Sequence, residues 1–200
     1  MCSNLLEYDC HLKTGWVMGK VSKEQAGRNR RAVVEAASRL LRAKGFDGVG
    51  VRELMLTAGL TQGAFSRQFA SKEALAAEAC ALAFEGAERA FVASIQGGSP
   101  GQARRLTNDY FRPKPAEHDC PMATLSIDAA RTPEDSAVRV TFVQGLERLA
   151  HVVAGDPPSP ERLVLLAAMV GTSILRRAGE NTELAGKMEA AVVAYSETLD

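Results

Sequence analysis

The segment AGLTQGAFSRQFASKEAL, residues 58–75, carries the side chains in this chain that are best suited to binding chemistry. Gln62 and Gln68 each have an amide that donates and accepts hydrogen bonds, which is the pairing that reads the edge of adenine. Arg67 and Lys72 are basic and suit contacts with phosphate. These residue types indicate recognition of a nucleic acid.

Two helix starts lie ten residues apart in this segment, at Thr61 and Ser71. A helix between them has about two turns, which is too short to be stable alone in water. Phe65 and Phe69 are four residues apart, so both lie on one face of the helix. We expect this face to pack against the neighbouring helices and hold the short helix in place. The outer face is slim enough to enter a DNA groove, since it carries Gly63, Ala64 and Ser66.

Two longer elements must position this short helix. Apolar spacing predicts a helix over 22–44 and a second over 51–58, joined by the turn GFDGVG. With a sharp turn at Gly59, the three helices form a helix-turn-helix whose last helix is free to enter a major groove. Arg52 and Lys72 lie in the first turns of the flanking helices, where they are placed to contact phosphates.

The distribution of charge agrees with this interpretation. The chain has 200 residues and no net charge, but residues 18–72 contain eleven Lys and Arg against four Asp and Glu, a net charge of +7. The remaining residues therefore carry −7. A basic module joined to an acidic remainder is typical of a protein that binds a polyanion through one part.

The stretch RRAVVEAASRLLRAKGFDGVGVRELMLTAGLTQGAFSRQFASKEALAAEA, residues 30–79, resembles the N-terminal DNA-binding domain of the TetR family of bacterial transcriptional repressors. The Gly-Phe turn at 45–46, AGLT at 58–61 and FSRQFASKE at 65–73 carry the resemblance. It implies an all-helical homodimer, a palindromic double-stranded DNA operator, and a C-terminal domain that binds a small-molecule effector and then releases DNA. The positions that it assigns to the DNA surface are Arg52, Thr61, Gln62, Gly63, Ala64, Ser66, Gln68 and Lys72.

One of these positions departs from the family's pattern. Family members usually carry tyrosine where this chain has Ser66, and the phenol contacts the phosphate backbone. Serine keeps a hydroxyl but lacks the reach and the ring. We therefore expect weaker binding or a different operator.

The rest of the chain also reads as helical, which predicts an all-α fold of about nine helices. Helix starts with proline in the first position occur at SPGQ (99–102), TPED (132–135) and SPER (159–162). We expect a flexible extension over 1–17, a helix-turn-helix domain over 18–72, and an effector-binding and dimerisation domain over 73–200.

The last two helices, near 160–178 and 181–199, are the expected dimer interface. Ala167, Ala168 and Gly171 allow close helix approach, and an apolar stripe runs from Leu184 to Leu199. The same stripes could instead pack within one subunit. The candidate effector-binding residues, which could equally be ordinary core, are Tyr110, Phe111, Met122, Phe142 and Leu146.

Catalysis has little support in the sequence. The three histidines, His11, His118 and His151, lie in no nucleophile or metal motif, and no two of the four cysteines form a CxxC pair. We predict no catalytic residue, no metal site and no cofactor, and a cytoplasmic location. The alternative is an all-helical ligand-binding protein without DNA binding.

Cys120 raises a second alternative, a repressor that senses oxidants or electrophiles. Pro121 suits the first position of a helix, so Cys120 would be the N-cap, where the positive end of the helix dipole favours a thiolate. The other interpretation, which the sequence favours, is a buried, unreactive cysteine. Cys80 lies in mid-helix and should be buried and inert.

Overall fold

The computed structural model describes residues 23–96, 101–179 and 182–200. Within them the fold is all-α, as predicted, and no strand occurs. Eight α-helices and two 3-10 segments are present, close to the nine helices expected. Their bounds are α1 (Lys23–Lys44), α2 (Val51–Thr57), η1 (Gln62–Arg67), α3 (Lys72–Ile95), α4 (Gln102–Phe111), η2 (Ala116–His118), α5 (Pro121–Arg131), α6 (Ala137–Ala154), α7 (Pro160–Ala178) and α8 (Glu183–Glu197). The expected extension over 1–17 lies outside the described residues.

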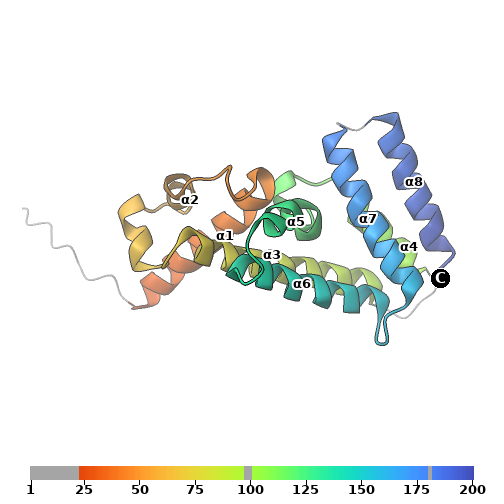
Figure 1. Ribbon diagram of the computed structural model, residues 1–200, viewed down its shortest axis with the longest axis horizontal. Coiled ribbons are helices and arrows are strands. Elements are labelled where there is room, and N and C mark those ends of the chain that lie inside the picture. The colour runs from red at the N-terminus through yellow and green to blue at the C-terminus, as the bar shows by residue number, and fades with distance from the viewer. Residues whose placement is uncertain (1–22, 97–100, 180–181) are drawn as a thin grey trace, which may run out of the picture.

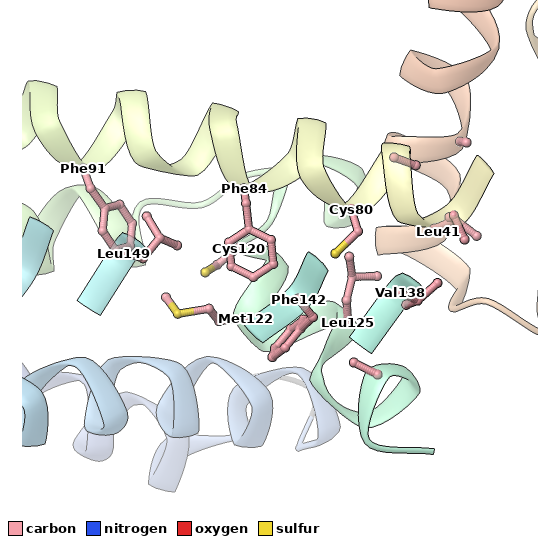
Figure 2. Packing of buried hydrophobic residues seen from close by; sticks show 14 of the residues in the cluster. Leu41, Cys80, Phe84, Phe91, Cys120, Met122, Leu125, Val138, Phe142 and Leu149 are labelled. Carbon is pink, nitrogen blue, oxygen red and sulfur yellow. The ribbon is translucent and has the colours of Figure 1, made fainter. Parts of the chain in front are cut away.

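Helix α3 is the central element, because it packs against α1 at one end and against α6 along its length (Figure 1). The rings of Phe84 on α3 and Phe142 on α6 meet edge to face, with centroids 5.3 Å apart. A Cβ atom on Gly145 would lie 2.2 Å from the Phe84 ring, so only glycine lets the two helices approach this closely. Figure 2 shows Phe84, Phe142 and Met122 in the core beside α3.

Two of the helix starts predicted from the sequence are confirmed, and one is wrong. Ser71 caps α3 by accepting a hydrogen bond from the Ala74 N–H at 3.0 Å, as predicted. Ser159 caps α7 in the same way. The start at TPED is wrong: Thr132 ends α5, and Ser136 caps α6 by accepting from the Arg139 N–H at 3.1 Å. Ser136 directly precedes α6, so its hydroxyl can accept from an N–H of the first turn that would otherwise be unpaired.

Helices α7 and α8 lie side by side at the opposite end of the molecule from α2 and η1 (Figure 1). The last helix begins at Glu183, close to the start near residue 181 expected from the sequence. Thr182 caps it, whereas Asn181 lies outside the described residues. Among the described residues, no helix is both long and apolar enough to cross a membrane.

Candidate nucleic-acid interface

The short element at residues 62–67 is a 3-10 helix and not the α-helix predicted from the sequence. Thr61 occupies the N-cap with an extended backbone, but its side chain accepts no capping hydrogen bond. The element is instead held by tertiary packing. The rings of Phe65 and Phe69 stack with centroids 5.7 Å apart, and Phe69 is buried against α1. Packing therefore stabilises a segment that caps and propensity leave marginal, as expected for so short a helix.

The outer side of η1 is exposed and carries small side chains. Thr61, Gln62, Gly63 and Ser66 are exposed, and a Cβ atom on Gly63 would meet no heavy atom within 4 Å. Arg52 is also exposed, in the first turn of α2. This surface is slim and polar, which are properties that a major groove accommodates.

Three of the predicted DNA residues face partly inward. Ala64 is half-buried against the core. The side-chain oxygen of Gln68 is buried and has no hydrogen-bond partner among the described residues, so it does not project outward as that of Gln62 can. Lys72 is half-buried, and its ammonium donates a hydrogen bond to the carbonyl oxygen of Phe46. Two of its three N–H bonds remain for another acceptor.

Arg30 was not predicted from the sequence, but it packs on the inner side of the η1 surface. Its guanidinium lies 4.3 Å from the centre of the Phe69 ring and pairs with Glu78 of α3 at 2.6 Å. No local pattern distinguishes it from the neighbouring basic residues of α1. The contact arises only when the chain folds.

Comparisons with known proteins agree with this architecture. The family model for bacterial regulatory proteins of the tetR family matches residues 33–79. A transcriptional repressor of Mycobacterium tuberculosis, described as HTH-type transcriptional repressor Rv1474c, is 30% identical over 194 residues, which span 80% of this chain and all of the relative. The chain belongs to the TetR family. It is a DNA-binding transcriptional regulator with a helix-turn-helix and a helical C-terminal region.

Solved structures share the fold at lower identity. A TetR transcriptional regulator from Chloroflexus aurantiacus superposes with a TM-score of 0.68 at 23% identity, covering 86% of this chain and 96% of the other. A structure of the multidrug binding protein EbrR complexed with imidazole gives a TM-score of 0.62 at 18% identity, covering 84% and 94%.

Four of the five candidate effector residues of this TetR-family chain are buried in the core. Tyr110, Phe111, Met122 and Phe142 are core residues with 2–9% exposure. Tyr110 packs edge to face against Phe91 and Phe111. Leu146 is 37% exposed and points away from this core, which separates it from the other four. A cavity of about 610 Å³ lies elsewhere, between the α1–α2 turn and the α5–α6 turn.

The burial of Cys120 favours the unreactive cysteine over the thiolate. Cys120 does occupy the N-cap of α5, but its sulfur makes no capping hydrogen bond and its side chain is buried. Burial raises the pKa of the Cys120 thiol, because a charged sulfur would lose its hydration. Cys80 is buried as predicted, and burial raises its pKa to about 12. Within the described residues, no three His, Cys, Asp or Glu side chains gather as a metal site.

Proposed function

We propose that the protein is a homodimeric repressor that binds a palindromic operator and is released from it by a small-molecule effector. The observation that carries this proposal is the exposed, slim face of η1, pinned from behind by Phe69 and flanked by basic residues. This chain matches the repressor of Mycobacterium tuberculosis over the whole length of that relative, which supports repression rather than activation.

The proposed operator surface consists of base-reading and phosphate-binding positions. Gln62 reads a base edge, and Arg52 and Lys72 bind phosphates on either side. We assign this surface to a domain over residues 18–72, and the effector and dimer functions to residues 73–200. The full set of proposed DNA contacts is Arg52, Thr61, Gln62, Gly63, Ala64, Ser66, Gln68 and Lys72.

The dimer is proposed to form through α7 and α8. Apolar side chains on these helices face solvent, including Val164 at 57%, Leu175 at 51% and Leu184 at 65% exposure. Ala167 is exposed, and a Cβ atom on Gly171 would meet nothing within 4 Å, so a second pair of helices can approach closely. Four such helices from two chains bury these side chains in a bundle.

The dimer is tested with a matched pair of substitutions. Val164→Lys on α7 should shift the protein from dimer to monomer in sedimentation experiments, because a buried ammonium is costly. Ile127→Lys on α5 is the control, since Ile127 is also 57% exposed and aliphatic. It should remain a dimer. If both variants or neither dissociate, α7 is not the interface.

The effector is proposed to enter the helical core around Tyr110, Phe111, Met122 and Phe142. EbrR is a multidrug binding protein with the same fold, which supports a small-molecule ligand here. These four side chains fill the core among themselves, so a ligand must displace them. We therefore expect an apolar or aromatic effector, whose binding rearranges α4, α5 and α6.

Selection of bound duplexes from a random DNA pool tests the proposal directly. The full-length protein should enrich a palindrome whose half-sites lie about one helical turn apart. Addition of single compounds to the selected complex then identifies the effector by loss of the shifted band. Enrichment of no sequence would favour a helical ligand-binding protein without DNA binding. In cells, the repressor acts in the cytoplasm on this operator, and a reporter placed behind it should be silenced.

A further inference from the structure

We propose that Asp128 is a positioning residue for DNA binding, because its carboxylate fixes the turn from which the helix-turn-helix is built. The inference rests on the operator binding proposed above. It concerns a contact between the region matched by the family model, residues 33–79, and a helix far outside it.

The contact joins α5 to the end of α1. The backbone N–H of Phe46 donates a hydrogen bond to Oδ2 of Asp128 at 3.0 Å, across 82 positions of sequence. Gly45 has a left-handed backbone with φ of +77°, and a Cβ atom on it would lie 3.0 Å from the same oxygen. Gly45 therefore provides both the turn and the room for the carboxylate.

The other polar group of the Phe46 backbone is also held by a side chain. Its carbonyl oxygen accepts a hydrogen bond from the ammonium of Lys72, the first residue of α3. The amide and the carbonyl of Phe46 are thus bound by side chains from two different helices. This residue is fixed more firmly than a turn held by its own backbone alone, since both of its backbone polar groups have side-chain partners.

The position of Phe46 determines where α2 begins. The turn that follows is tight, because a Cβ atom on Gly48 would lie 2.2 Å from the carbonyl oxygen of Lys44. An ion pair between Lys44 and Glu53 then ties the end of α1 to the first turn of α2. Because α2 packs against η1, the turn sets the direction of the surface that meets DNA.

The other end of the contact lies on a helix of the C-terminal region. Helix α5 packs against α6 and α7 and contributes Met122 and Leu125 to the core. A rearrangement of that core moves α5, and Asp128 with it. The cavity of about 610 Å³ opens beside Phe46, Lys72 and Asp128, so water can replace the Phe46 N–H at the carboxylate when α5 moves. The clamp therefore has a closed and an open arrangement.

Operator binding needs the closed arrangement. A palindrome presents two half-sites at a fixed spacing, and both helix-turn-helix units must face it together. Holding each unit in one orientation on α5 lowers the entropy lost on binding. Release of the clamp leaves the unit folded and α1 still packed on α3, η2 and α5, but it removes one restraint on the turn before α2, which weakens affinity with only a small loss of stability.

The experiment compares three full-length variants on the selected operator. Asp128→Ala removes the acceptor, and we expect about tenfold weaker binding with a melting temperature lowered by no more than about 4 °C. Asp128→Asn keeps an oxygen that accepts from Phe46, so it should bind within about twofold of wild type. Asp135→Ala is the matched control: Asp135 lines the same cavity without a hydrogen bond or ion pair among the described residues, and should bind as wild type.

Amide hydrogen exchange at Phe46 separates failure of this proposal from failure of operator binding. Exchange should be faster in Asp128→Ala than in wild type and near normal in Asp128→Asn, whether or not DNA is bound. Unchanged exchange in Asp128→Ala overturns the clamp. So does wild-type affinity in that variant, or an equal loss in Asp135→Ala. If wild type itself binds no DNA, the function proposed above fails, and the exchange rates still decide the contact.

Discussion

The guanidinium carbon of Arg30 lies 4.3 Å above the centre of the Phe69 ring. Arg30 belongs to α1, and Phe69 follows the recognition element η1, so the contact holds the DNA-facing segment against the first helix. Glu78 of α3 pairs with the same guanidinium at 2.6 Å. One side chain therefore joins three elements behind the DNA surface.

Substitution of Arg30 should destabilise the helix-turn-helix more than loss of its ion-pair partner does. We expect Arg30→Ala to lower the free energy of unfolding by about 1 kcal/mol, since it removes both the cation–π contact and the alkyl packing on Phe69. Glu78→Gln should cost about 0.5 kcal/mol or less, because the pair is near half exposed and screened by solvent. Urea unfolding measures both. Equal losses in the two variants would contradict the role given to the ring contact.

Gly145 is expected to be the least tolerant glycine of the core. Gly145→Ala places a methyl group 2.2 Å from the ring of Phe84, which is fully buried and cannot give way. The free energy of unfolding should fall by about 2 kcal/mol. Gly86→Ala on α3 is the control, because the nearest atom to its Cβ is the end of the Arg89 side chain at 4.0 Å. It should gain about 0.5–1 kcal/mol from helix propensity. A neutral Gly145→Ala would show that α3 and α6 can separate.

The all-α fold could be predicted from the sequence because periodic apolar spacing and local caps are short-range signals. Ser71 and Ser159 illustrate this, since each accepts from an N–H three residues on. The turn after α5 could not be predicted in the same way. There the sequence predicted a start at TPED, whereas α5 ends at Thr132 and Ser136 caps α6.

The candidate site was predictable only where a residue's role is local. Gln62 and Ser66 project outward because η1 packs through Phe65 and Phe69, a pattern visible in their spacing. The hydrogen bond of Lys72 could not be predicted from local sequence, since its acceptor, Phe46, lies 26 positions earlier in the chain. Cys120 illustrates a choice that the local pattern could not decide. The helix start was located correctly, but burial raises the thiol pKa and outweighs the dipole, and burial is a tertiary property.

Stability should fall at alkaline pH because of the buried thiol of Cys80. Its pKa is raised from 9.0 to about 12 in the folded protein, so the folded state keeps a proton that the unfolded state loses. The stabilisation is complete below pH 9.0 and is lost as pH rises toward 12. Above pH 9, wild type should lose up to about 1.4 kcal/mol per pH unit more than Cys80→Ala. Urea unfolding at pH 8, 9 and 10 checks this. Parallel pH profiles for the two proteins would mean that the thiol ionises freely.

Salt dependence should distinguish phosphate contacts from base contacts on the operator. A dimer that makes about six to eight phosphate contacts should show a slope of log K against log salt of roughly −5 to −7. Arg52→Ala should weaken binding to all sequences alike and reduce the magnitude of the slope by about 2, one contact from each subunit. Gln62→Ala should leave the slope unchanged and relax the preference at one base position per half-site, by about 1–3 kcal/mol.

The control for these measurements is Arg104→Ala. Arg104 is exposed on α4 and pairs with Glu197 at 3.1 Å. Helix α4 lies at the opposite end of the molecule from α2 (Figure 1). Its loss removes the same charge but no DNA contact, so affinity and slope should remain those of wild type at moderate salt. If Arg104→Ala flattens the slope as much as Arg52→Ala does, the effect comes from overall charge, and the surface around η1 has no special role in phosphate binding. A wild-type slope near zero would contradict DNA binding by this surface altogether, because contacts with phosphates necessarily release counterions.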